Sequence, residues 1–149
     1  MFDRLLKKPS PVTVGPAKHG QGVFAAQRFR VGQQIGEISG KIINDPDYGS
    51  NYCIDVGTPH SLEPDAPYRF LNHCCDPNGK LFVISNDDEP ADKIKVVIEA
   101  LKNIQPGTEI TIDYEWAADA AIRCGCGAPQ CRGWVVSLAE LHIVEKYAD

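Results

Sequence analysis

Short runs of alternating hydrophobic and polar residues, separated by glycine and proline, dominate this chain. Its 13 glycines and 11 prolines are spread along the whole sequence, and residues of this kind mark the turns between strands. In the clearest run, Ile94, Val96, Ile98 and Ala100 fall on one face at period two. The pattern predicts a mainly β protein whose short strands are Val12–Val14, Gly22–Ala26, Gln34–Ile43, Tyr52–Val56, Lys80–Ile84, Lys93–Ala100 and Glu109–Tyr114.

Helical periodicity is confined to the C-terminal part of the chain. Residues Ala117–Ile122 suit one short helical turn, and Ser137–Tyr147 carries apolar residues at spacing three. The acidic segment Asn86–Asp92 is read in two ways, as a docking patch for a basic substrate or as a solvated hairpin tip. The second interpretation is favoured, because acidic loops at hairpin tips are common.

Size and charge limit the function classes. A chain of 149 residues with 43% hydrophobic residues matches one globular domain. The formal charge of -5 argues against direct nucleic-acid binding, which needs clustered Lys and Arg. No apolar run is long enough to span a membrane, and Met1–Ser10 shows no signal-peptide pattern. We therefore expect an intracellular protein, cytoplasmic or nuclear, without a membrane partner.

Three of the six cysteines, Cys124, Cys126 and Cys131, have the spacing of a metal site. Zinc prefers four thiolate or imidazole ligands, so this loop lacks one. Cys75 is the candidate fourth ligand, and His73 and Cys74 are alternatives for the same position. A closed site of four thiolates would be structural, since no position is left for substrate.

Two further patterns carry candidate chemistry. Glu109–Tyr114 alternates, so that Ile112 and Tyr114 share one face of the predicted strand while Glu109 and Asp113 share the other. The Gly20-Gln21-Gly22 segment either brings backbone groups close to a ligand or forms a plain turn. It does not fulfil the dinucleotide-binding fingerprint, because no third glycine and no βαβ context follow.

Taken in order, these segments resemble the SET domain with its post-SET tail, a family of protein lysine methyltransferases. The family pattern G-x-G, R-F-x-N-H-x-C-x-P-N, E-L-x-x-D-Y and C-x-C-x4-C-R-G-W is matched from about Pro11 to Val135. The matching residues are Gly20, Gly22, Arg69, Phe70, Asn72, His73, Cys75, Pro77, Asn78, Glu109, Asp113, Tyr114, Cys124, Cys126, Cys131, Arg132, Gly133 and Trp134.

The resemblance implies a SET-domain β-clip, in which several small curved sheets meet through a pseudoknot. It divides the chain into an N-terminal extension at residues 1–11, a SET domain at 12–116, and a post-SET segment with zinc and a C-terminal helix at 117–149. Cys74 and Ile110 depart from the usual Ser and Leu, and the segment between Tyr52 and Arg69 is short.

The resemblance also implies two small-molecule partners, S-adenosyl-L-methionine as methyl donor and structural Zn2+. Residues Gly20, Gln21, Gly22, Arg69, Asn72, His73 and Trp134 would bind the donor. Cys75, Cys124, Cys126 and Cys131 would hold the metal. The acceptor would be a lysine of a protein or peptide, with a histone tail as one option.

For the reaction, the resemblance makes Tyr114 the catalytic residue and Tyr52 a second candidate, for which core packing is the alternative. Ile112 and Trp116 would line the lysine channel, although surface packing explains Trp116 equally well. An apolar residue at Ile112 implies room for di- or trimethyl-lysine. A catalytically silent SET-like module that binds a protein tail is the rival function. Cys53, inside a predicted strand, is expected to be a small buried hydrophobe.

Overall fold

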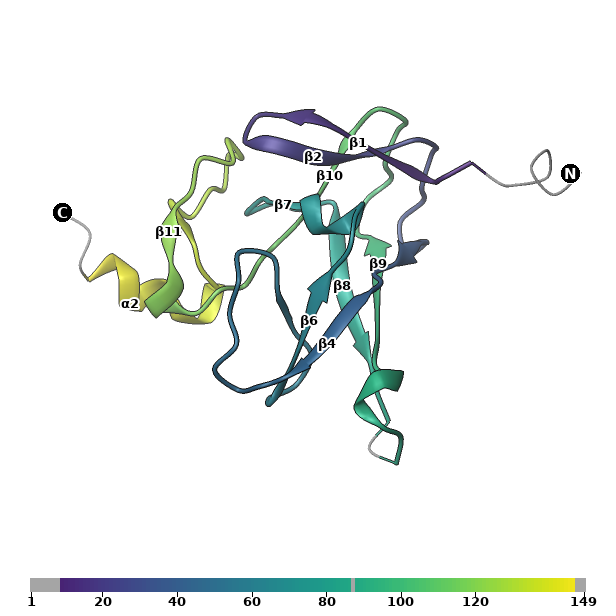
Figure 1. Ribbon diagram of the computed structural model, residues 1–149. Coiled ribbons are helices and arrows are strands. Elements are labelled where there is room, and N and C mark those ends of the chain that lie inside the picture. Colours follow the sequence, from purple (N-terminus) through teal and green to yellow (C-terminus); the bar gives the residue numbers. More distant parts are fainter. Residues whose placement is uncertain (1–8, 87, 147–149) are drawn as a thin grey trace, which may run out of the picture.

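The fold consists of small β-sheets with little helix, as the hydrophobic pattern predicts (Figure 1). The computed structural model describes residues 9–86 and 88–146. Within these residues, strands pair in four sheets with the orders β1-β2-β10-β7, β3-β9-β8, β4-β6-β5 and β11-β12. The strands are β1 (Val12–Ala17), β2 (Gly20–Ala25), β3 (Gln34–Glu37), β4 (Gly40–Asn44), β5 (Ile54–Asp55), β6 (His60–Pro64), β7 (Asn72–His73), β8 (Gly79–Ile84), β9 (Lys95–Ala100), β10 (Glu109–Ile112), β11 (Ile122–Arg123) and β12 (Trp134–Val135).

The helical elements are short. They are the 3-10 turns η1 (Tyr68–Phe70), η2 (Ala91–Lys93), η3 (Ala118–Ala120) and η4 (Leu138–Glu140), and the helix α2 (Leu141–Glu145). The helix expected over Ser137–Tyr147 is therefore split, and Tyr147 lies outside the described residues. Within the described ranges, no helix is long and apolar enough to cross a membrane.

The predicted strand Gln34–Ile43 is wrong, because the chain changes sheets in its middle. Ile38 still donates its N–H to Val96 of β9, whereas Gly40 already pairs with Pro64 of β6. At Gly40 the two backbones come so close that a Cβ would clash with the carbonyl oxygen of Glu63. A side chain would prevent this crossing, and glycine permits it.

The predicted strand Tyr52–Val56 is also too long, since only Ile54–Asp55 pairs as β5. The Ser50 hydroxyl accepts hydrogen bonds from the backbone N–H groups of Tyr52 and Cys53. This side chain holds the preceding backbone in a turn, which competes with strand pairing.

The central strand β10 joins distant parts of the chain. On one edge it pairs antiparallel with β2, and on the other it pairs parallel with β7, Thr111 opposite Asn72. The side chain of Asn78 extends the pairing: it donates to the Glu109 carbonyl and accepts from the Thr111 N–H, both at 2.9 Å. The segment that follows η1 thus meets β10, the strand that leads to Tyr114, as the expected pseudoknot requires.

The core lies where β2, β9 and β10 meet. Val23, Ile98 and Ile110 are fully buried there, one from each strand. This packing fixes the face of β10 that carries Ile110 and Ile112 and sends Glu109 and Thr111 to the opposite face. The acidic segment Asn86–Asp92 links β8 to η2 and β9, so it belongs to a hairpin connection; Asp87 lies outside the described residues.

Candidate active site

Four cysteines gather beside the end of β7. Cys75 follows β7, while Cys124, Cys126 and Cys131 come from the loop between β11 and β12. Their four Sγ atoms all lie within 4.8 Å of one another, and the Cys75–Cys124 pair is 3.8 Å apart. Four thiols converging on one point match the tetrahedral ligand set that structural zinc prefers. The prediction that Cys75 approaches the distant loop is confirmed.

His73, the alternative candidate for the fourth metal ligand, lies beside the thiol cluster and is not one of its four members. Its Nδ1 accepts the backbone N–H of Tyr114 at 3.1 Å, and its Nε2 lies 3.4 Å from the Cys75 Sγ. Burial lowers the pKa of His73, partly offset by Asp113. A neutral ring with hydrogen on Nε2 therefore faces the Cys75 sulfur, the arrangement of a group that supports a metal ligand.

The thiols of the cluster differ in acidity. Burial raises the pKa of Cys126, but backbone N–H groups at Cys75 and Ala128 and neighbouring thiols outweigh it and lower the pKa to about 6. Because thiolate is the form that binds metal, Cys126 is ready to ligate at neutral pH. Cys74 directs its thiol to the Asp76 carbonyl oxygen at 3.4 Å instead.

Tyr114 is held by neighbours from the segment around β7. Its hydroxyl donates to the carbonyl oxygen of Leu71. Burial, reinforced by the charge of Glu109, raises the pKa of Tyr114 to about 12. The phenol is therefore neutral near pH 7, so it acts as a hydrogen-bond donor and positioning group rather than as a base.

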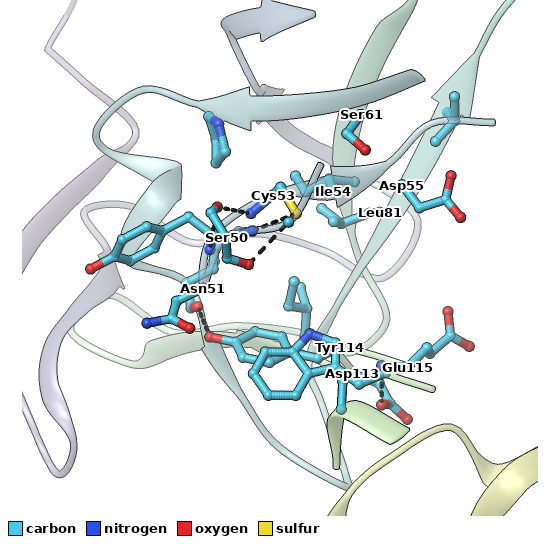
Figure 2. Close-up of a pocket in the computed structure, with 18 of the residues that line it drawn as sticks. Ser50, Asn51, Cys53, Ile54, Asp55, Ser61, Leu81, Asp113, Tyr114 and Glu115 are labelled. Atoms are coloured by element: carbon cyan, nitrogen blue, oxygen red, sulfur yellow. Dashed lines mark hydrogen bonds between the residues drawn. The ribbon is translucent and has the colours of Figure 1, made fainter. Parts of the chain in front are cut away.

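A groove with a volume of about 1110 Å3 opens beside this phenol. Figure 2 shows Asp113, Tyr114 and Glu115 on one wall, across from Cys53, Ile54 and Leu81. Trp116 also lines the groove; its ring centroid lies 5.2 Å from that of Tyr114. The buried Ile112 contributes an apolar surface. The proposed channel residues Ile112, Tyr114 and Trp116 thus come together in space.

Tyr52 and Arg69 form another part of the same groove. The Arg69 guanidinium lies 4.4 Å from the centroid of the Tyr52 ring, within cation–π distance. Tyr52 is 42% exposed, so core packing does not explain its position. Cys53 also lines the groove and is only half-buried, so its expected burial is wrong. The Ser50 turn, which keeps Cys53 out of the strand, accounts for this.

The glycine segment meets β7 through side-chain contacts. Gly20 has φ of +74°, which favours glycine, and it begins β2. The Asn72 Nδ2 donates to the Gln21 carbonyl at 2.9 Å and to the Glu109 Oε2 at 2.8 Å. A Cβ on Gly22 would lie only 2.6 Å from that same oxygen. Gly20, Gln21, Gly22 and Asn72 therefore form one connected surface.

Trp134 lies on β12, where the Arg123 guanidinium covers its ring at 4.1 Å. Within the described part of the chain it forms no hydrogen bond with the glycine segment. Its role toward a cofactor stays a prediction.

Sequence reasoning missed an ion pair that docks the C-terminal segment. The Arg132 Nη2 lies 2.9 Å from the Asp113 carboxylate and also donates to the Val136 carbonyl. The Arg132 backbone N–H donates to the Cys75 sulfur. Both residues stand inside the recognised motifs, Asp113 directly before Tyr114 and Arg132 directly after Cys131, and their opposite charges were the available sign of a pair. The pairing itself depends on tertiary contacts that the sequence pattern does not specify.

Comparison with known proteins agrees with this geometry. A fold of small sheets that joins a tyrosine strand to an Asn-His segment beside a four-thiol cluster is that of a SET-type domain. The family model described as SET domain matches residues 20–115. The chain belongs to the SET-domain family.

The chain is similar to histone-lysine N-methyltransferases described as H3 lysine-4 specific. The relative from Candida albicans is 31% identical over 154 aligned positions, covering 90% of this chain and 14% of the relative. The relative from Saccharomyces cerevisiae is 28% identical, with the same coverage. The chain therefore spans about a seventh of these relatives.

Solved structures support the fold. The complex of KRYPTONITE with mCHG DNA and SAH superposes with a TM-score of 0.71 at 26% identity, covering 83% of this chain and 28% of that one. Arabidopsis thaliana SUVH6 in complex with SAM gives a TM-score of 0.72 at 23% identity, covering 88% of this chain and 34% of that one.

Proposed function

We propose that this chain is an S-adenosylmethionine-dependent protein-lysine N-methyltransferase. The observation that carries the proposal is the neutral Tyr114 phenol beside the groove, because its hydroxyl donates to the Leu71 carbonyl and its backbone N–H donates to His73 Nδ1. The connected surface of Gly20–Gly22 and Asn72 spans β10, because β2 and β7 pair with its two opposite edges. The similarity to histone-lysine N-methyltransferases and to KRYPTONITE, which was crystallised with SAH, supports the same reaction.

The chemistry is an in-line displacement. S-adenosylmethionine supplies a methyl group on a sulfonium; the lysine nitrogen forms the new N–C bond while the C–S bond breaks and its electron pair stays on sulfur. The amine must arrive neutral, having released its proton to solvent, since free lysine has a pKa of about 10.4. Ile112 and the ring of Trp116 offer an apolar lining that disfavours the ammonium form.

Positioning is the task of Tyr114. With its hydroxyl donating to the Leu71 carbonyl, the ring cannot swing away, and it holds one wall of the channel. Alignment of amine and methyl carbon at near-attack distance is the contribution that such a wall makes to rate. Tyr52 is the candidate for a second wall.

For the cofactor, we propose binding by Gly20, Gln21, Gly22, Asn72, His73, Arg69 and Trp134. The contact of Asn72 with Gln21 supports the first four. The assignment of Arg69 and Trp134 to cofactor binding rests on the family resemblance. In the structure, Arg69 lines the groove and the Trp134 ring contacts Arg123.

For the substrate, we propose a lysine in a protein tail of the histone type. Relatives are described as H3 lysine-4 specific, and KRYPTONITE was crystallised with an H3(1-15) peptide. In this chain, Asp55 and Glu115 line the groove and suit a basic peptide. A histone substrate would make the nucleus the place of action.

Structural zinc at Cys75, Cys124, Cys126 and Cys131 completes the proposal. Metal binding would hold the C-terminal segment against β7, since Cys75 belongs to the body and the other ligands to the tail. We also propose the division into an extension at 1–11, a SET domain at 12–116 and a post-SET segment at 117–149.

Two measurements test the activity. The protein is incubated with an H3 tail peptide and methyl-labelled cofactor, and incorporation is compared for wild type and Tyr114→Phe. We expect incorporation to fall by about a hundredfold in the variant, while calorimetry shows cofactor binding retained. A peptide with each lysine replaced by arginine is the matched control.

The silent tail-binding module is distinguished by the same assay. It predicts peptide binding without any incorporation by the wild type, even when cell extract provides the substrate. That outcome, with cofactor binding also absent, would refute the proposed enzyme.

A further inference from the structure

We propose that Glu109 is a positioning residue for cofactor binding, which acts by fixing the side-chain amide of Asn72. The inference rests on the proposed function of the glycine segment and Asn72. It concerns a residue that lies behind the proposed binding groups and is not itself among them.

The orientation of Glu109 follows from the strand it begins. Ile110 and Ile112 of β10 face the core, so alternation directs Glu109 to the opposite face. There its Oε2 accepts a hydrogen bond from the Asn72 Nδ2 at 2.8 Å. Parallel pairing of β10 with β7 sets Asn72 opposite Thr111, two residues along the strand from Glu109 and on the same face, so the Glu109 side chain reaches Asn72 diagonally.

The contacts of Asn72 settle which atom is left for a ligand. Its Nδ2 also donates to the Gln21 carbonyl at 2.9 Å, so both amide hydrogens are used. An ionised carboxylate and a carbonyl can only accept, and this excludes the flipped amide. Among residues 9–86 and 88–146, Asn72 Oδ1 has no hydrogen-bond donor, so it is available to accept from an N–H or ammonium group of the cofactor.

The carboxylate also contacts the glycine segment directly. A Cβ on Gly22 would lie 2.6 Å from Glu109 Oε2 and 2.8 Å from the Ala17 Cβ. The Glu109 backbone is itself held by the Asn78 side chain. One carboxylate thus joins β2, β7 and β10, and its charge also reaches Tyr114, whose pKa it helps to raise.

The test is a double-mutant cycle on cofactor affinity, measured by calorimetry with S-adenosylmethionine on the full chain. Variants are Glu109→Ala, Asn72→Ala and the double variant, with Glu89→Ala on the distant hairpin as the control. We expect Glu109→Ala to raise Kd about tenfold, because a charge-assisted hydrogen bond to a ligand-binding amide is lost. The double variant should bind no more weakly than Asn72→Ala alone.

Glu109→Gln keeps the size of the side chain and one acceptor oxygen. It replaces Glu109→Ala in the cycle if thermal unfolding shows that the alanine variant does not fold. We expect it to raise Kd less than the loss of Asn72 does. An unchanged Kd in the Glu109 variants, or additive losses in the cycle, would overturn this inference alone. Absence of binding by the wild type would overturn it together with the proposed function.

Discussion

At the residue scale, Tyr114 shows how tertiary contacts change the chemistry of a common side chain. A tyrosine at the end of an alternating strand usually packs with its hydroxyl in water. Here the hydroxyl donates to the Leu71 carbonyl, and the phenol lies near the charge of Glu109. Both features favour the neutral form over the phenolate.

This leads to a pH prediction for stability. The pKa of Tyr114 is raised to about 12 in the folded protein, against about 10 in an unfolded chain. Its contribution is fully present below about pH 10 and is lost as pH rises through about 12. We expect the wild type to lose on the order of 2 kcal/mol more than Tyr114→Phe between these limits. Urea unfolding at pH 9 and pH 11.5 should show most of this difference, and equal losses would contradict the placement.

A second prediction concerns Ile112, which is buried at the channel wall. Because its side chain has no polar group and leaves room beside the amine, we expect the wild type to form di- or trimethyl-lysine under excess cofactor. Ile112→Tyr should shift the product towards monomethyl-lysine. Mass spectrometry of the substrate peptide measures the distribution, and strict monomethylation by the wild type would count against the channel assignment.

At the element scale, β10 organises the molecule, because its two edges hold β2 and β7. The sequence predicted this strand well, since four alternating residues carry a strong period. It did not predict β7, a two-residue strand with no periodicity of its own. Parallel pairing with β10 creates β7, and no local pattern encodes such a partner.

The boundary between β3 and β4 gives a prediction of its own. A Cβ at Gly40 would clash with the Glu63 backbone, which cannot move without breaking the β4–β6 pairing. We expect Gly40→Ala to lower the free energy of unfolding by about 2 kcal/mol. Gly49→Ala is the matched control, since a Cβ there meets no atom within 4 Å. Urea unfolding compares them; similar small effects in both would argue against the close crossing.

At the scale of the whole molecule, the four thiols connect the C-terminal segment to the body. We expect one zinc per chain by elemental analysis. Cys75→Ser should lose it, because a hydroxyl is a poor substitute for thiolate. Cys74→Ser and Cys53→Ser should retain it, since these thiols lie outside the cluster.

Chelation should have a matching effect on the fold. Loss of the metal would leave the tail to the Arg132–Asp113 ion pair and its hydrogen bonds. Limited proteolysis should then cut within residues 117–146 first. If Cys75→Ser kept its zinc and Cys74→Ser lost it, the fourth ligand would be Cys74 and not Cys75.

Much of the site could be predicted because it lies in segments with unusual composition. The cysteine spacing indicated a metal, and the family pattern brought Cys75, Asn72 and Tyr114 together. The partners of these residues were not predictable. The contact of Glu109 with Asn72 and that of Arg132 with Asp113 depend on strand register and on chain crossing, which residue spacing does not determine.

The contact between His19 and Gly125 has a consequence for biosynthesis. The His19 ring lies 3.1 Å from the Gly125 carbonyl across a separation of 106 residues. A chain emerging from the ribosome cannot close this contact until the cysteine loop has left the exit tunnel. The first hairpin must wait without its neighbour, and such non-local closure slows folding. The turn between β1 and β2 therefore stays without this contact until the loop that carries Gly125 has been synthesised.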